Sequence, residues 1–208
     1  MPRNRSPDEV EEFRRRLCDV AERLFAERGK EGVTMRELAR ELGVSAMTPY
    51  RYFQDKESIL AAVRANAFDD FAAALEAATR IPGNAAERAD AVGRAYLHFA
   101  FSKPAAYRLM FDLAQQDDGR FPDLERAGKR ARATMTGYME ALVAGGFLAG
   151  DPEMLGQIFW ATVHGLIVLH LAGKLQPKPD FATVHRTAMS LLARGAQAVN
   201  RLEQRRAS

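Results

Sequence analysis

The sequence has few of the residues that build covalent or metal-centred sites. Its 208 residues include one cysteine, Cys18, and four histidines. A single cysteine excludes an internal disulfide and any cluster held by several cysteines, and it suits a reducing compartment. We expect Cys18 to be a small buried side chain on a helix. The first thirty residues are dense in Arg and Glu and lack the apolar run of a secretory signal, so we expect a cytoplasmic protein.

The motifs of the common enzyme classes are also missing. A di-iron centre in a helical bundle requires Glu three residues before His, but Ala or Ile stands at that position before each histidine of this chain. No Gly-rich phosphate loop and no Gly-x-Ser-x-Gly nucleophile elbow is present. We therefore expect no enzymatic activity, no metal and no cofactor. A helical module that binds another protein through its grooves is a rival interpretation.

The amino-terminal part of the chain has no surplus of positive charge. The formal net charge is +3 and the pI is near 9.2, values that invite a nucleic-acid interpretation. Residues 1–60, however, contain twelve basic and twelve acidic residues, so their net charge is zero. The run Arg14-Arg15-Arg16 is expected on a solvated helix face, with phosphate-backbone contacts as the alternative. Charge alone therefore does not predict nucleic-acid binding, and the residue pattern has to decide.

Residues 154–173 are twenty consecutive residues without a formal charge, about the length that crosses a bilayer. The segment contains Gln157, Thr162, His164 and His170, which disfavour a membrane span. A helix that is apolar on all sides is also what a buried subunit interface requires. We expect the interface and no membrane contact.

Apolar residues recur at helical spacing along nearly the whole chain, and no segment alternates as a strand does. Capping boxes at residues 6–9 and 34–37 start the first two helices. The pattern predicts an all-α fold of about nine helices. The helices after the first three are expected at residues 55–79, 85–102, 104–116, 121–144, 152–173 and 180–202.

Residues 34–53 have the pattern of a helix-turn-helix. A capped helix through Leu42 is followed by Gly43, and a second short helix ends near Phe53. That second helix starts at Ser45 or at Thr48, and the later start would put Pro49 at the first helical position, where proline is accepted. In such motifs the second helix places its amino-terminal turns in a major groove of DNA. A helical hairpin without this function can show the same spacing.

Two strings make the pattern more specific: AERLFAERG at residues 21–29 and TMRELARELGVSAMTPYRYFQDKESIL at residues 34–60. Over residues 13–60 the chain closely resembles the TetR family of transcriptional regulators, without gaps. The WATVHG string at residues 160–165 resembles the Trp…His-Gly signature of one carboxy-terminal subtype. The resemblance implies a homodimeric repressor. Its DNA-binding domain would be residues 1–60, and residues 61–208 would form a helical domain for ligand binding and dimerisation.

The resemblance also implies a set of DNA contacts. Thr34, at a helix amino terminus, matches a phosphate-binding position. Arg36 matches a position that reaches a base edge, and Lys56 matches a phosphate-binding lysine at the start of the next helix. The recognition element would contribute Ser45, Ala46, Met47, Thr48, Tyr50, Arg51 and Tyr52. Of these, Ala46 and Met47 can touch only thymine methyl groups, and the two tyrosines match phosphate or packing positions.

The second domain is implied to bind a small effector and to dimerise through residues 152–202. Apolar residues at near-heptad spacing within 181–202 suit helix pairing. The expected partners are therefore double-stranded operator DNA, a second copy of the chain and an effector of unknown identity. We expect a mostly apolar effector wedged against the helix that starts at Asp55. Candidate lining residues, each of which could instead be ordinary core, are Tyr96, His98, Tyr107, Met110, Phe111, Phe147, Trp160 and His164.

Overall fold

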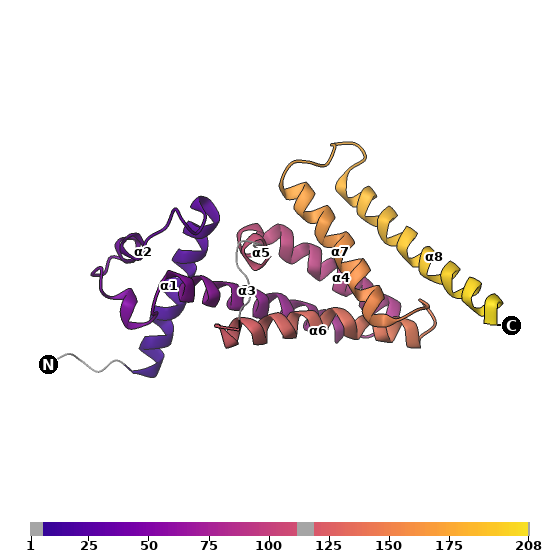
Figure 1. The fold of residues 1–208 in the computed structure, drawn as a ribbon, viewed down its shortest axis with the longest axis horizontal. Coiled ribbons are helices and arrows are strands. Elements are labelled where there is room, and N and C mark those ends of the chain that lie inside the picture. The colour runs from indigo at the N-terminus through magenta and orange to yellow at the C-terminus, as the bar shows by residue number, and fades with distance from the viewer. Residues whose placement is uncertain (1–5, 112–118, 208) are drawn as a thin grey trace. The chain divides into compact units, whose positions relative to one another are not determined.

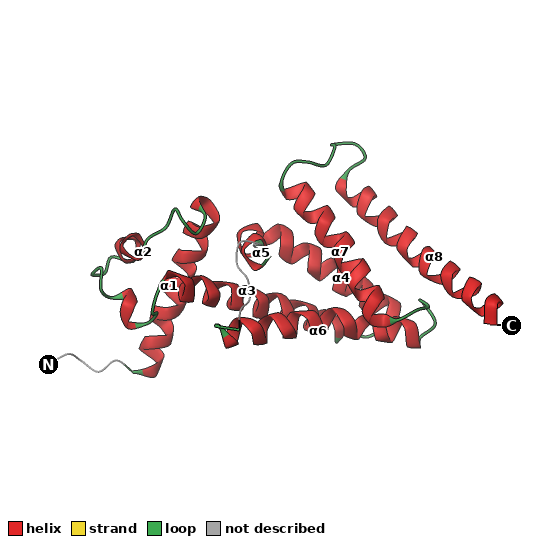
Figure 2. Cartoon of the chain, in the orientation of Figure 1, coloured by secondary structure: helices red, strands yellow, loops and turns green. Residues whose placement is uncertain are grey.

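The computed structural model of the protein describes residues 6–111 and 119–207, with side-chain environments up to residue 197. The described residues form eight α-helices and one short 3-10 helix, with no strand among them (Figure 2). The prediction of an all-α fold is confirmed. The remaining expected helix, the second one of the helix-turn-helix, is a single 3-10 turn.

Figure 1 shows the order of the helices along the chain. They are α1 (Pro7–Arg28), α2 (Met35–Glu41), η1 (Pro49–Arg51), α3 (Lys56–Thr79), α4 (Ala85–Ser102), α5 (Pro104–Met110), α6 (Pro122–Ala144), α7 (Pro152–Leu171) and α8 (Phe181–Ala207). The helix expected at 104–116 is shorter than predicted and ends at Met110, and the rest of that stretch from residue 112 lies outside the described residues.

Side-chain caps fix where several helices begin. The Ser6 hydroxyl accepts a hydrogen bond from the backbone N–H of Glu9 (3.2 Å), and the Glu9 carboxylate accepts one from the backbone N–H of Ser6 (2.8 Å). Asp55 caps α3 in the same reciprocal way, because its carboxylate and backbone N–H pair with the backbone N–H and hydroxyl of Ser58. These bonds satisfy amide groups that the first helical turn leaves without intrahelical partners. The predicted capping boxes are confirmed.

The chain divides into two compact units. Unit 1 consists of Met1–Phe71 and Lys103–Arg130, and unit 2 consists of Ala72–Ser102 and Ala131–Ser208. Helices α3 and α6 therefore have residues in both units. The division expected at residue 60 follows the DNA-binding motif rather than compactness, and it stays a prediction about function.

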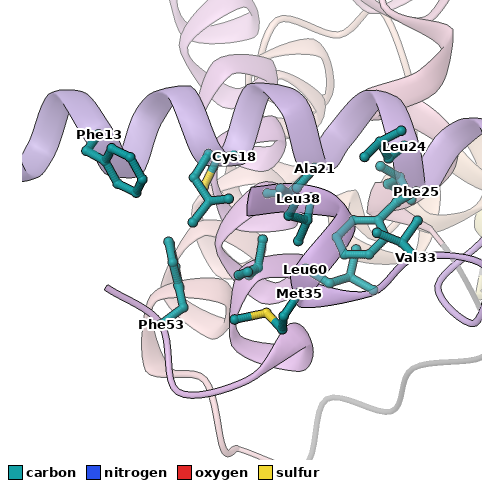
Figure 3. Close-up of a cluster of buried hydrophobic side chains, with 14 residues drawn as sticks. Phe13, Cys18, Ala21, Leu24, Phe25, Val33, Met35, Leu38, Phe53 and Leu60 are labelled. Atoms are coloured by element: carbon teal, nitrogen blue, oxygen red, sulfur yellow. The ribbon is translucent and has the colours of Figure 1, made fainter. Parts of the chain in front are cut away.

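The core of unit 1 is built around the apolar face of α1. Phe13, Leu17, Ala21 and Phe25 on α1 face side chains from α2, α3 and the segments between them (Figure 3). The remaining buried members of this cluster are Cys18, Leu24, Val33, Met35, Leu38, Phe53, Ile59, Leu60, Val63 and Leu109. As expected, Cys18 is a small buried side chain, and burial raises the pKa of its thiol to about 12.

Unit 2 leaves much of its apolar surface uncovered. Helix α7 has a mean hydropathy of 1.5 over an 18-residue window, so by length and composition it could cross a bilayer. Only 17% of that window is buried within the chain, although α7 packs beside α8 (Figure 1). Its exposed large side chains include Met154, Ile158, Val168 and Leu169, and Leu191 is exposed on α8. An apolar surface of this kind marks a site of interaction.

Candidate nucleic-acid interface and ligand cavity

Helix α2 is placed by a cap at one end and a tight turn at the other. The Thr34 hydroxyl accepts a hydrogen bond from the backbone N–H of Glu37 (3.3 Å) and donates to its carboxylate (2.9 Å). These bonds from Thr34 hold the pKa of Glu37 below its ordinary value. At the other end Gly43 has a φ of 67°, a left-handed conformation that favours glycine. The chain thereby reverses, and the backbone N–H of Val44 donates to the carbonyl of Ala39 (3.0 Å).

The recognition element is shorter than a regular helix because of Pro49. Thr48 is its N-cap and Pro49 its first helical residue, so the later of the two predicted starts is confirmed. The 3-10 turn spans only Pro49–Arg51, and α3 begins five residues after it. The hydroxyl groups of Ser45 and Thr48 form a hydrogen bond (2.9 Å), which stabilises the turn that precedes the 3-10 helix. Pro49 is buried, which ties this turn to the core of unit 1.

Most of the predicted DNA-contacting side chains lie exposed. Met47 is 69% exposed and Tyr50 is 49% exposed, so neither belongs to the core. Arg36 and Arg51 make no ion pair with any residue that the structure describes, which leaves both guanidinium groups available to an anion. The exposed predicted positions are Thr34, Arg36, Ser45, Ala46, Met47, Tyr50 and Arg51, and the partly buried ones are Thr48, Tyr52 and Lys56.

Two residues of α1 anchor the recognition element, and the sequence analysis did not assign them this role. The Phe13 and Tyr52 rings stack with centroids 4.3 Å apart. Arg14 donates to the carbonyl of Tyr52 (2.6 Å), and its guanidinium lies 4.1 Å from the centroid of the Phe53 ring. Tyr52 is therefore a packing residue in this structure, and Arg14 does not lie on the solvated face expected for it. The signal that was available is the position of Arg14 directly after Phe13, at the border of the apolar face.

Lys56 is the first residue of α3, and its ammonium group already has a hydrogen bond and an ion pair within the chain. Its ammonium donates to the carbonyl of Lys30 (2.6 Å) and lies 3.7 Å from the carboxylate of Glu31. Glu31 is 88% exposed, so its ion pair with Lys56 is weak and a stronger anion can replace the Glu31 carboxylate. The position at a helix amino terminus favours such an anion, because the helix dipole and the ammonium charge act together there.

A cavity of about 880 Å³ lies within unit 2, a size within the range of ligand sites. Its walls are residues of α4, α6, α7 and α8 and are mostly apolar. The apolar lining residues include Val92, Leu97, Phe101, Met135, Met139, Leu142, Phe159 and Val163. Polar lining groups come from Asp90, Arg94, His98, Ser102, Tyr138, His185 and Arg186.

The cavity brings together three of the eight residues predicted to line a ligand site: Tyr96, His98 and Trp160. The other five lie elsewhere. Tyr107, Met110 and Phe111 belong to unit 1, where Tyr107 and Met110 are each 1% exposed. Phe147 is exposed on a turn, and His164 is beside Trp160 with ring centroids 6.0 Å apart but is not part of the cavity wall. No residue of α3 lines the cavity either, although an effector was expected against that helix.

Two histidines of unit 2 are partly desolvated. Burial lowers the pKa of His164 and of His185 below the ordinary value. The His185 ring stacks on Phe181, with centroids 5.9 Å apart. His185, which the sequence analysis did not select, is therefore a neutral polar group in an aromatic wall, suited to a hydrogen bond with a bound molecule. Its place on the apolar face of α8, four residues after Phe181, was the available signal.

Two protein-family models match the chain. A family model described as bacterial regulatory proteins of the tetR family matches residues 17–63. A second, described as the tetracyclin repressor-like carboxy-terminal domain, matches residues 89–192, which is half of the chain. An HTH-type transcriptional regulator of Staphylococcus aureus is 39% identical over 51 residues. That match covers 24% of this chain and 28% of the relative, so the likeness to such curated relatives spans about a quarter of their length.

Solved structures match over nearly the whole length. A protein of unknown function from Rhodococcus sp. RHA1 is 27% identical, with a TM-score of 0.77 over 94% of this chain and 98% of the other. FadR from Bacillus subtilis, in complex with stearoyl-CoA, is 18% identical, with a TM-score of 0.71 over 86% of this chain and 97% of the other. The second likeness shows a shared fold. With both family models matched, the chain belongs to the tetR family of bacterial regulatory proteins.

Proposed function

We propose that the protein is a cytoplasmic repressor without catalytic activity, which binds double-stranded operator DNA as a homodimer and is released by a small, mostly apolar ligand. The observation that carries the ligand part is the mostly apolar cavity of about 880 Å³ in unit 2. A cavity of that size between packed helices is uncommon unless something occupies it. FadR, which shares the fold, is described in complex with stearoyl-CoA, and this supports a small-molecule site in the same fold.

The dimer would form through residues 152–202. Helix α7 leaves most of its apolar surface uncovered, and Leu191 adds exposed apolar surface on α8. Pairing α7 and α8 with the same helices of a second copy would bury these side chains in a twofold interface. Such a dimer presents two recognition elements to neighbouring major grooves of an operator with matching half-sites. This accounts for the apolar helix without a membrane.

Helix α6 supplies a physical connection for release. Met135 and Met139 of α6 line the cavity, while Arg126 and Arg130 of the same helix bind Asp69 of α3 in unit 1 at 2.8 and 3.0 Å. These two arginines hold the pKa of Asp69 below its ordinary value. A ligand that shifts α6 would therefore act on α3, which begins at Lys56. A tenfold loss of operator affinity requires only about 1.4 kcal/mol of coupling, within the usual allosteric range.

A thermal-shift screen of apolar metabolites, followed by operator-release assays on the hits, tests this function. Ligands that bind the folded chain should raise its melting temperature and weaken operator binding together. Trp160→Ala should remove the thermal shift, because Trp160 lines the cavity. Phe147→Ala is the matched control, since Phe147 is an aromatic residue outside the cavity and is 41% exposed. Hits that stabilise the protein but leave operator affinity unchanged would contradict release by ligand.

Mutation should distinguish the proposed phosphate contact of Lys56 from the proposed base contact of Arg36. Lys56→Ala should weaken binding to all sequences about equally and lower the slope of log affinity against log salt by about 1, since a phosphate contact carries no sequence information. Arg36→Ala should relax preference at one base pair per half-site, at a cost of roughly 1–3 kcal/mol. Both are measured by binding to an operator and to single-base variants at several salt concentrations.

Arg132→Ala is the matched control for these variants, because it removes an exposed cation from unit 2. It should change neither affinity nor preference. If Arg36→Ala lowers affinity for every sequence alike, its assignment to base readout is wrong and Arg36 is a phosphate contact.

A further inference from the structure

A second, smaller cavity adjoins the large one along the interface of α4 and α6. Its volume is about 280 Å³, and its walls also include two residues of α3, Glu76 and Thr79. On α4, the lining changes from the small cavity to the large one between Arg88 and Ala89, which are consecutive residues. On α6, Tyr138 lines both cavities. Tyr138 is therefore the side chain at the boundary between them.

The two cavities differ in chemistry. The large cavity is mostly apolar, whereas the small one is lined by Glu76, Arg88, two threonines and several alanine or glycine residues. The threonine hydroxyls already donate to backbone carbonyls, Thr79 to Glu76 (2.8 Å) and Thr134 to Ala131 (2.7 Å). The small cavity therefore offers fewer apolar contacts to a bound chain than the large cavity does.

The ring and the hydroxyl of Tyr138 have different environments. Its ring packs against the cluster of Met139, Leu142, Leu148 and Leu155. Its hydroxyl makes no hydrogen bond with any side chain or backbone group in the described part of the chain. Burial raises the pKa of Tyr138 to about 12, so at neutral pH the group is a neutral phenol that can donate and accept. Because Tyr138 lines both cavities, this hydroxyl can form a hydrogen bond with a molecule bound there.

The larger cavity also tolerates an anionic group on its ligand. Its charged lining residues are Arg94, Arg186 and Asp90, so one positive charge is in excess. Arg94 pairs with Asp90 one helical turn earlier on α4. A chain with a carboxylate at one end is therefore a suitable probe for the site.

We propose that Tyr138 determines which effector the larger cavity accepts: its ring ends the space open to an extended apolar chain, and its hydroxyl selects a chain whose inner end bears an oxygen. The inference rests on the proposed function, because it takes the larger cavity to be the effector site. The ligand class is an elongated amphipathic molecule, apolar along most of its length, with a hydroxyl or carbonyl oxygen at the end that meets Tyr138.

Calorimetric titration of the full chain with two graded series of straight-chain saturated carboxylates tests the proposal. One series is unsubstituted, and the other carries a terminal hydroxyl. Wild-type affinity should rise with chain length up to a limit, and at that limit the hydroxylated chain should bind roughly two- to tenfold more tightly than its parent. Tyr138→Phe should keep the length limit and lose the preference for the hydroxylated chain.

Tyr138→Ala should move the limit to longer chains, because it joins the two cavities. Tyr138→Leu keeps more of the packing and should shift the chain-length limit in the same direction by a smaller amount. The test therefore stands even where the alanine variant does not fold. An unchanged limit in the leucine and alanine variants would overturn the role of the ring. A Tyr138→Phe variant that keeps the preference would overturn the role of the hydroxyl, and wild-type protein that binds no member would overturn both. Binding with this pattern but without operator release supports Tyr138 while contradicting only the proposed release.

Discussion

Replacing Leu191 by glutamate should convert the dimer to a monomer and lower operator affinity by at least about a hundredfold, or about 2.7 kcal/mol. Leu191 is 64% exposed on α8, so the substitution costs little within one chain. In a twofold interface the same change places two carboxylates in an apolar environment without partners, and each buried unpaired charge costs several kcal/mol. Sedimentation velocity at micromolar concentration measures the first effect, and operator titration measures the second.

Leu191→Met is the matched control, because it keeps an apolar side chain of similar volume at the same position. It should remain a dimer with wild-type operator affinity. A Leu191→Glu protein that sediments as a dimer would remove α8 from the proposed interface. A monomeric variant that still binds the full operator as tightly as wild type would show that DNA binding does not depend on the dimer.

Replacing Leu38 by alanine should lower the free energy of unfolding by about 2–5 kcal/mol. Leu38 has no exposed surface and lies at the centre of the cluster that joins α1, α2 and α3 (Figure 3). The cost combines the lost transfer free energy of the side chain and the cavity left behind. Since domains are stable by only about 5–15 kcal/mol, much of the helix-turn-helix should unfold on mild heating. Denaturant unfolding and the temperature dependence of operator binding measure this.

Leu42→Ala is the control within the same motif. Leu42 has the same side chain, but it is only partly buried where α2 ends, so its loss should cost clearly less. Equal losses for the two variants would mean that the packing around α2 is looser than the buried contacts of Leu38 indicate.

Local patterns were enough to predict that the chain is helical and where several of its helices begin. The capping boxes of Ser6 and Thr34 act within four residues, and glycine at position 43 reverses the chain by its own backbone conformation. Apolar residues at helical spacing likewise mark which face of α1 is buried, because that spacing is set by the helix itself. The late start of the recognition element, one of the two starts that the sequence left open, has the same local origin, because proline is accepted at the first helical position.

The tertiary structure alone decided how side chains distant in sequence meet. Arg14 reaches the carbonyl of Tyr52, 38 residues away, and α1 thereby supports the element proposed to bind DNA. An aromatic residue predicts burial but not which cavity or core it joins. Trp160 therefore lines the cavity, while Tyr107 packs in the other unit. The position of Tyr138 between two cavities has the same origin, because a cavity exists only where several helices fail to fill the space between them, and no local pattern records that space.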